Sequence, residues 1–288
     1  MNVLLTGASG FIGRNVAAVL AEAGHQVRPL SRRHGIDVRH MLAPPDWLPH
    51  LDGIDAVINC IGIIGERSVQ RFTPLHTLAP IALFRACAAA GIHRVVQISA
   101  LGADDTAFSA YHLSKRAADD FLRTLDLEWF VLRPSLIYGL GGTSGNLFMR
   151  LARLPCIPVV GDGQQQVQPV HISDVTAAVL HSLTVAKSKT TLDILGSETF
   201  TFGEWLQRMR EAQGLPRAPL LCVPFPLALM LARLGRYISP MLHPENLLML
   251  NAGYRADVQP LTDFLGRMPR PFAPHLLFAN ALTAGEQP

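Results

Sequence analysis

The sequence predicts an α/β fold, a doubly wound parallel sheet with a smaller C-terminal lobe, and three observations support this class. Short β-rich runs alternate with helical patterns through the first half of the chain, which is typical of a parallel sheet covered by helices on both faces. A glycine-rich turn joins the first predicted strand to the first predicted helix. After Pro134 the segments become shorter and richer in proline, which indicates a second lobe.

The spacing of apolar residues and the turn residues between the apolar runs predict the strands and helices of the first half. Strands are predicted at Asn2–Thr6, Gln26–Leu30, Ala56–Cys60, Arg94–Ser99 and Glu128–Arg133. Helices are predicted at Phe11–Ala23, Pro74–Ala90 and Ser109–Leu125. Gly24 and Gly91 stand where a helix must end and lead into the next strand.

The second half gives a helical segment at Leu147–Leu154 and a hairpin or turn within Val159–Val170. Asp174 is expected to cap a helix that runs to about Val185. We therefore predict a sheet domain at 1–138, to which 165–185 return, a smaller lobe at 139–164 and 186–279, and a disordered tail at 280–288.

Composition narrows the class of function. The 288 residues carry a formal charge of +3 without a basic block, which excludes a nucleic-acid-binding stripe. No cysteine pairing suggests a metal site, and no signal peptide precedes the first strand, so we expect a cytoplasmic protein with a small-molecule partner. The apolar stretch Leu220–Leu234 is interrupted by prolines and is interpreted as lobe core, with peripheral membrane contact as the alternative. No oligomeric state is indicated.

The glycine-rich turn Thr6–Gly13 carries the strongest functional signal. Gly7 allows a tight turn, Gly10 lets a backbone approach a pyrophosphate, and Gly13 lets the helix pack on the strand. The helix then presents free N–H groups and a positive dipole to the phosphates. This pattern predicts a Rossmann dinucleotide site whose loop contacts come from Gly7, Ser9, Gly10, Phe11, Ile12 and Gly13.

The residues after the second strand favour NADP(H) over NAD(H). An acidic side chain there would bind the ribose 2′-hydroxyl and repel a 2′-phosphate. This chain has Ser31, Arg32 and Arg33 instead, and two guanidinium groups suit bidentate phosphate binding. A solvated basic turn is the alternative.

Tyr111 and Lys115 are four residues apart and lie on one face of the predicted helix. A nearby ammonium group stabilises a phenolate, so we expect the pKa of Tyr111 to be lowered. Such a tyrosine can exchange a proton with a carbonyl oxygen while a cofactor transfers hydride. An exposed pair without a role in catalysis is the alternative.

With these motifs the chain resembles the atypical, extended short-chain dehydrogenases/reductases. The matching segments are TGASGFIG at Thr6–Gly13, the turn Asn59–Gly62, YHLSK at Tyr111–Lys115, LRPSLIYG at Leu132–Gly139 and VQPVHISDV at Val167–Val175. INCIGIIGE, QISALGAD and GDGQQQVQPVHISDV are similar to the branch that contains the NADPH-binding accessory subunit of respiratory complex I. That branch is commonly labelled NAD-dependent epimerase/dehydratase.

The resemblance assigns further residues by motif. It implies that Ile61 and Gly62 border the adenine and ribose, and that Pro134 and Ser135 approach the nicotinamide. Ser99 is the candidate for polarising the substrate carbonyl.

Two positions depart from the family pattern. Ala100 and Leu101 follow Ser99 where the family usually has a serine or threonine. His76 replaces a common asparagine, either as a proton relay or as a packing residue.

Three functions follow from these residues. The first is an NADP(H)-dependent oxidoreductase acting on a small carbonyl or hydroxyl substrate, which the weakly charged C-terminal lobe suggests is apolar. The second is a non-catalytic assembly protein with structural NADPH. The third is a nucleoside-diphosphate-sugar epimerase or dehydratase.

Overall fold

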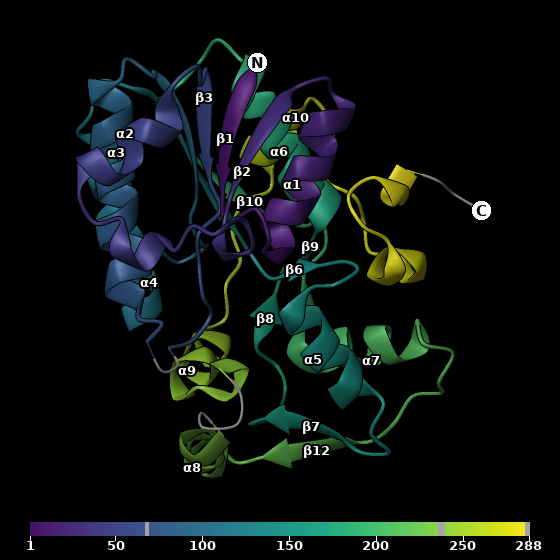
Figure 1. The fold of residues 1–288 in the computed structure, drawn as a ribbon. Coiled ribbons are helices and arrows are strands. Elements are labelled where there is room, and N and C mark those ends of the chain that lie inside the picture. Colours follow the sequence, from purple (N-terminus) through teal and green to yellow (C-terminus); the bar gives the residue numbers. More distant parts are fainter. Residues whose placement is uncertain (67–68, 236–239, 286–288) are drawn as a thin grey trace. The chain divides into compact units, whose positions relative to one another are not determined.

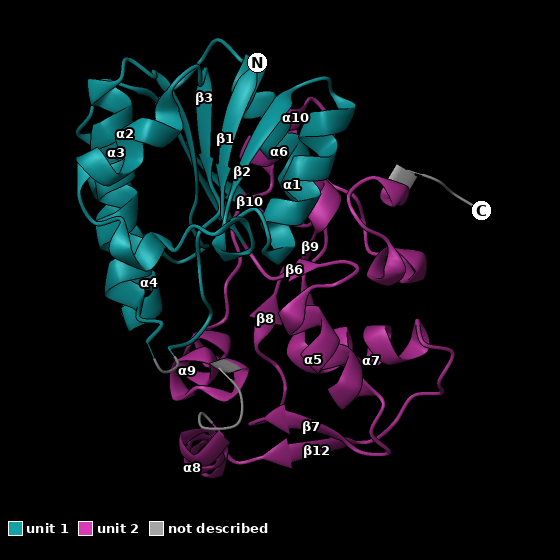
Figure 2. Ribbon diagram, viewed as in Figure 1, with its two compact units in different colours: residues 1–134, 175–193 teal, residues 135–174, 194–288 magenta. Residues whose placement is uncertain are grey.

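The chain forms two compact units in the computed structural model, which describes residues 1–66, 69–235 and 240–285 (Figure 2). Unit 1 comprises Met1–Pro134 and Val175–Asp193, and unit 2 comprises Ser135–Asp174 and Ile194–Pro288. The first unit thus ends at 134 and resumes at 175, where the sequence suggested 138 and 165.

A parallel sheet forms the centre of unit 1 and confirms the predicted fold class. Its strand order is β10-β5-β4-β3-β1-β2, and β1 pairs in parallel with both β2 and β3. Strand β4 likewise pairs in parallel with β3 and β5. The strands are β1 (Asn2–Thr6), β2 (Gln26–Leu30), β3 (Ala56–Asn59), β4 (Arg94–Ile98), β5 (Glu128–Pro134) and β10 (Thr190–Ile194). The strand order reverses at β1, so the loop after β1 lies where such sheets bind ligands.

Helices cover both faces of this sheet, as Figure 1 shows, with α2, α3 and α4 on one side and α1 and α6 on the other. Their bounds are α1 (Phe11–Glu22), α2 (Pro44–Leu51), α3 (Ala79–Ala89), α4 (Ala110–Arg123) and α6 (Ile172–Thr184). The helix predicted from Pro74 begins instead as a π-helical turn, η3 (Thr73–Leu78), before α3 continues it. Short 3-10 turns η1 (Arg32–His34) and η2 (Val38–His40) follow β2. Trp47, Phe84 and Leu122 are fully buried in the core between α2, α3, α4 and the sheet.

Unit 2 is built from short strands and helices around a second apolar core. Trp205 on α7 is fully buried there and makes edge contacts with Tyr138 and Phe272. The strands are β6 (Ile137–Tyr138), β7 (Ile157–Val160), β8 (Gln166–Val167), β9 (Val170–His171), β11 (Phe200–Thr201) and β12 (Leu220–Val223). The helices are α5 (Thr143–Ala152), α7 (Phe202–Glu211), α8 (Phe225–Gly235), η4 (Pro240–Leu242), α9 (Pro244–Ala252), α10 (Gln259–Leu265), η5 (Pro274–Phe278) and η6 (Thr283–Gly285).

Three local expectations in this half were wrong in whole or in part. Of the hairpin or turn expected within Val159–Val170, only the turn forms, where the Gly163 N–H donates to the Val160 carbonyl, because β7 pairs with β12 and β8 pairs with β11. Asp174 does not cap a helix, since α6 already begins at Ile172 and the buried Asp174 carboxylate accepts hydrogen bonds from Arg267 and the Arg270 backbone.

The third concerns the C-terminal segment. The Asn280 carboxamide accepts backbone hydrogen bonds from Leu282 and Thr283, and Ala284 is buried, so 280–285 are ordered. The remainder of the tail, 286–288, lies outside the described residues.

Candidate functional site

Two glycines of the loop after β1 are required by close backbone contacts. Gly7 has φ +66°, and a Cβ on it would lie 2.5 Å from the Cys60 carbonyl oxygen. A Cβ on Gly13 would lie 2.3 Å from the Gly7 carbonyl oxygen and 2.8 Å from the Ala8 Cα. No side chain fits at either position, so both glycines hold the loop against β3 and the first turn of α1.

Gly10 differs from the other two glycines. It is the N-cap of α1, is solvent-exposed, and a Cβ there would meet only the Gly7 carbonyl oxygen, at 3.2 Å. The first N–H groups of a helix, here those of Phe11, Ile12 and Gly13, have no acceptor within the helix. Open space beside unpaired donors fits a diphosphate group, for which Gly10 leaves the backbone accessible. Ser9, the remaining predicted contact, is half-buried in the same loop.

The end of β2 carries the residues predicted to select the cofactor. Ser31 is buried, and its hydroxyl lies 2.8 Å from the Nδ1 of His34. Arg32 and Arg33 are exposed in η1, and within the described part of the chain neither guanidinium has an ion pair. The Leu30 carbonyl accepts a 3.5 Å hydrogen bond from Ala8, which connects this end of β2 to the glycine loop. Two free cationic side chains therefore follow the strand whose end contacts that loop.

A chain of buried polar side chains runs across the sheet between β1 and α4. The Thr6 hydroxyl donates to Asn59 Oδ1 at 2.5 Å, and Asn59 Nδ2 donates to Gln97 Oε1 at 2.7 Å. Gln97 Nε2 then donates to Asp119 Oδ1 at 3.3 Å. Ser99 donates its hydroxyl to the other carboxylate oxygen of Asp119. All five side chains are buried, so each depends on these partners.

Lys115 reaches from α4 to the carboxyl ends of β3 and β4. Its ammonium group is 3% exposed and donates to the carbonyl oxygens of Ile61 and Ile98, each at 2.9 Å. Burial lowers the pKa of Lys115 to about 8, opposed by the negative charge of Asp119. The third ammonium proton has no partner among the described residues, which leaves one donor for a ligand.

Tyr111 lies one helical turn before Lys115, as predicted, but its pKa does not shift as expected. Burial, together with the charge of Asp119, raises the pKa of Tyr111 to about 12. The ring makes edge contacts with Phe72, His76 and His112. The expectation of a lowered pKa was wrong because burial of the phenol and the nearby Asp119 carboxylate both disfavour the phenolate.

His76 packs beside this tyrosine and is fully buried. Its Nε2 accepts a 3.0 Å hydrogen bond from the Ile63 N–H, and its Nδ1 lies 3.0 Å from the Ser114 hydroxyl. Burial, together with the charge of Lys115, holds the pKa of His76 well below its usual value. A neutral imidazole with both nitrogens engaged favours the packing role over the proton relay.

The residues assigned by resemblance lie at the ends of strands. Ile61 is buried, and a Cβ on the exposed Gly62 would lie 3.2 Å from the Lys115 Nζ, so a side chain there would push that ammonium group by a few tenths of an ångström. Pro134 ends β5 in unit 1, where its carbonyl accepts from the Leu101 N–H at 2.9 Å. Ser135 begins unit 2 and donates its hydroxyl to the Gln168 carbonyl.

Sequence reasoning missed Asp119, which connects Ser99 to the rest of the buried network. Ser99 points its hydroxyl at this carboxylate, and that contact favours a positioning role over direct polarisation of a substrate. Asp119 lies four residues after Lys115 on α4, and this spacing was the signal that could have identified it.

Asp119 should make the stability of the protein depend on pH. Burial raises its pKa from 3.8 to about 6, so the folded chain holds a proton between about pH 4 and 6 that the unfolded chain releases. The resulting stabilisation is complete below about pH 4 and is lost as the pH rises through 6. Relative to Asp119→Asn, the wild type should lose on the order of 3 kcal/mol of unfolding free energy across this window.

Denaturant unfolding at a series of pH values measures this difference. The neighbouring Asp120 is half exposed and ion-paired with Arg123, so Asp120→Asn is the matched control and should keep the wild-type slope. Parallel curves for wild type and Asp119→Asn would show that the Asp119 carboxylate titrates normally.

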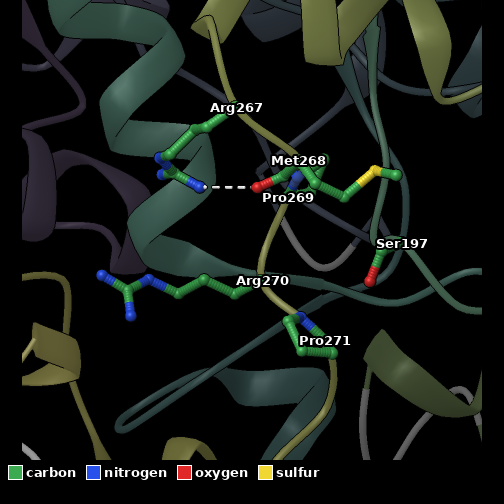
Figure 3. Close-up of a pocket in the computed structure, with 6 residues that line it drawn as sticks. All are labelled: Ser197, Arg267, Met268, Pro269, Arg270 and Pro271. Atoms are coloured by element: carbon green, nitrogen blue, oxygen red, sulfur yellow. Dashed lines mark hydrogen bonds between the residues drawn. The ribbon is translucent and has the colours of Figure 1, made fainter.

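Unit 2 also contains a pocket of about 450 Å³, lined by Ser197, Arg267, Met268, Pro269, Arg270 and Pro271 (Figure 3). Both arginine side chains extend to the side away from Ser197 in this view. Arg267 is ion-paired with Asp174, and Arg270 donates to the Ala284 carbonyl. The polar groups do not converge on one point, so this pocket lacks the arrangement of a ligand site.

Comparison with known proteins identifies the family. The model of the NAD dependent epimerase/dehydratase family matches residues 3–194, which include the glycine loop, Tyr111 and Lys115. The chain belongs to this family.

Three curated relatives are similar to part of the chain. A ceramide reductase of Caulobacter vibrioides is 33% identical over 190 residues, covering 62% of this chain and 59% of that protein. A 2-alkyl-3-oxoalkanoate reductase of Stenotrophomonas maltophilia is 30% identical over 217 residues, covering 64% of each. NADH dehydrogenase [ubiquinone] 1 alpha subcomplex subunit 9 of Arabidopsis thaliana is 29% identical, covering 77% of this chain and 60% of that protein. The chain spans about three fifths of the length of these relatives.

Solved structures share the fold over nearly the whole chain. A UDP-glucose 4-epimerase of Thermotoga maritima superimposes with a TM-score of 0.74 at 18% identity, covering 98% of both chains. MoeE5 in complex with UDP-glucuronic acid and NAD gives 0.73 at 23% identity, covering 96% of both. At this identity the likeness shows the fold alone.

Proposed function

We propose that this protein is an NADP(H)-dependent oxidoreductase that acts on a small, apolar carbonyl or hydroxyl substrate. The observation that carries the proposal is one unit that holds both an open phosphate-binding loop, with Gly10 at its centre, and the pair Tyr111 and Lys115 on α4. The names of two relatives, a ceramide reductase and a 2-alkyl-3-oxoalkanoate reductase, support an apolar substrate.

The cofactor would be held by groups along the carboxyl ends of β1, β2 and β3. The N–H groups of the first turn of α1 would bind the diphosphate, and Arg32 and Arg33 the 2′-phosphate. Ile61 and Gly62 would border the adenine and ribose, and Pro134 and Ser135 the nicotinamide. The remaining ammonium proton of Lys115 would donate to a ribose hydroxyl.

NADPH, when bound, supplies a hydride for a carbonyl carbon. Tyr111 keeps its phenolic proton at neutral pH, since its pKa is about 12, and we propose that this proton goes to the carbonyl oxygen. Ser99 and Asp119 would position α4 against β4 through their hydrogen bond. A neutral tyrosine beside a cationic lysine thus suits carbonyl reduction.

The two alternative functions are less favoured. A non-catalytic role would not require the buried lysine that reaches the carbonyl oxygens of Ile61 and Ile98 beside Tyr111. The sugar-nucleotide epimerases that resemble the chain do so in fold alone.

Fluorescence titration with NADPH and NADH, followed by oxidation assays, tests this function. The second substrates should include long-chain ketones, quinones, aldehydes and sugar nucleotides. NADPH oxidation by an apolar carbonyl compound is the expected result. Tight NADPH binding without turnover on any of them would support the structural role of the cofactor instead.

Removing Arg32 or Arg33 should weaken the binding of NADPH and leave the binding of NADH nearly unchanged. Arg32→Ala or Arg33→Ala should weaken NADPH binding about 10- to 100-fold, because a charge-assisted hydrogen bond contributes about 1.5–3 kcal/mol. NADH binding should stay within about twofold, since NADH has no 2′-phosphate. Arg208→Ala removes an exposed arginine of α7 and serves as the control. An equal loss for both cofactors would disprove the assignment of these arginines to the 2′-phosphate.

A further inference from the structure

Helix α8 in unit 2 buries its small residues and exposes its large ones. A water-soluble protein normally arranges a surface helix the other way, with large apolar residues toward the core. Its buried positions are Ala228, Ala232 and Gly235. Its exposed large apolar residues are Leu227 (44%), Met230 (51%), Leu231 (52%) and Leu234 (65%), and Phe225 and Leu229 are half-buried.

Packing fixes this orientation of α8. A Cβ on Gly235 would lie 2.9 Å from the Cβ of Leu242 in η4, so the helix approaches η4 through its small face. Rotating α8 to bury Leu231 or Leu234 would put a large side chain where Gly235 now fits. The exposed leucines are therefore a consequence of how the helix packs.

Strand β12 extends the apolar surface on the N-terminal side of α8. Leu220, Leu221 and Cys222 are exposed, and Leu221 reaches 55%. Only Pro224 separates β12 from α8, and Figure 1 shows the two at the same end of unit 2. We call the exposed side chains of these two elements the α8–β12 face. Large exposed apolar side chains gathered on two adjacent elements commonly mark an interaction site.

The charges around the α8–β12 face are basic. From residue 212 to residue 244 the sequence has no acidic residue, and its arginines among the described residues are Arg217 and Arg233. Arg233 is exposed on α8 itself, and Arg217 lies 3.6 Å from Glu211. The elements that contact β12 and α8 carry acidic residues at Asp162, just after β7, and at Glu245, half-buried on α9.

We propose that the α8–β12 face rests on a lipid surface that contains anionic headgroups. Exposed leucine and methionine side chains would enter the boundary between headgroups and acyl chains, and Arg233 would remain at the level of the lipid phosphates. None of the helices among the described residues is long and apolar enough to cross a bilayer, so this contact lies on the membrane surface. The proposal does not depend on the cofactor or on the reaction proposed above.

Sedimentation of the full chain with lipid vesicles tests the proposal. The wild type should bind vesicles of phosphatidylcholine mixed equally with phosphatidylglycerol, bind phosphatidylcholine alone more weakly, and lose binding as salt is raised. The double variant Leu231→Gln/Leu234→Gln should partition roughly tenfold less, because two apolar side chains no longer enter the lipid. Arg233→Glu should weaken binding to the anionic vesicles only.

Leu154→Gln is the matched control, since Leu154 is an exposed leucine of unit 2 outside α8 and β12. It should bind vesicles like the wild type. NADPH titration and thermal unfolding of each variant monitor folding separately from lipid binding. The proposal is overturned if the wild type binds neither vesicle, or if Leu231→Gln/Leu234→Gln binds as well as the wild type. A concentration-dependent dimer that this double variant abolishes, without vesicle binding, would identify a second copy of the chain as the occupant.

Discussion

Tyr111→Phe is expected to lower kcat about 10²- to 10⁴-fold, the range in which a positioned general acid contributes to proton transfer. The variant removes only the phenolic oxygen. The ring contacts with Phe72 and His76 remain, so the fold and the affinity for NADPH should change little. Steady-state oxidation of NADPH with the best substrate measures kcat, and fluorescence titration measures binding.

The pH profile of the wild type should reflect the titration of Lys115 and not that of Tyr111. Because the pKa of Tyr111 is about 12, reduction should show no loss from tyrosine deprotonation at any pH below about 10. The lowered pKa of Lys115, about 8, instead predicts a decline as the pH rises through 8 and the ammonium group loses its charge.

Tyr138→Phe is the control for removal of a phenol elsewhere. Tyr138 is buried in the core of unit 2 against Trp205, far from α4 in sequence, and its loss should leave kcat within about twofold. If both Tyr111→Phe and the control Tyr138→Phe retained full activity, the proton would have to come from another group or from water. The proposed role of Tyr111 would then be wrong.

Local patterns were sufficient for the elements that surround the glycine loop. β1 and β2 have the predicted bounds, because an apolar run between turn residues leaves a buried strand few alternatives. The need for glycine at position 13 follows from backbone contacts with Gly7 and Ala8 inside the motif, whereas Gly7 is required by its contact with Cys60, which lies after β3. The pairing of Tyr111 with Lys115 follows from the helical repeat alone.

Contacts between distant segments could not be predicted in this way. The buried network connects Thr6, Asn59, Gln97 and Asp119, and its members belong to three strands and a helix. The pKa of Tyr111 depends on burial, which no local pattern gives. The strand partners in unit 2 were missed for the same reason, since β7 pairs with a strand about sixty residues later in the chain.

We expect Gly13 and Gly10 to have different roles in the glycine loop. Gly13→Ala should mainly destabilise the fold, and Gly10→Val should mainly weaken the binding of NADPH. In Gly13→Ala the new Cβ would lie 2.3 Å from the Gly7 carbonyl oxygen, so backbone atoms must move. We expect a loss of about 3 kcal/mol in unfolding free energy. In Gly10→Val the new side chain meets little protein, and the loss should be about 1 kcal/mol or less.

The affinity for NADPH, in contrast to the stability, should fall strongly in Gly10→Val. Its valine side chain would occupy the space in front of the N–H groups of Phe11 and Ile12, and NADPH binding should fall at least about 100-fold, as expected when two hydrogen bonds to a charged group are lost. Urea unfolding and NADPH titration of the same samples measure the two effects independently. A Gly10→Val protein that binds NADPH like the wild type would place the diphosphate elsewhere. The first helix would then serve only the fold, because its free N–H groups would have no ligand in the proposed site.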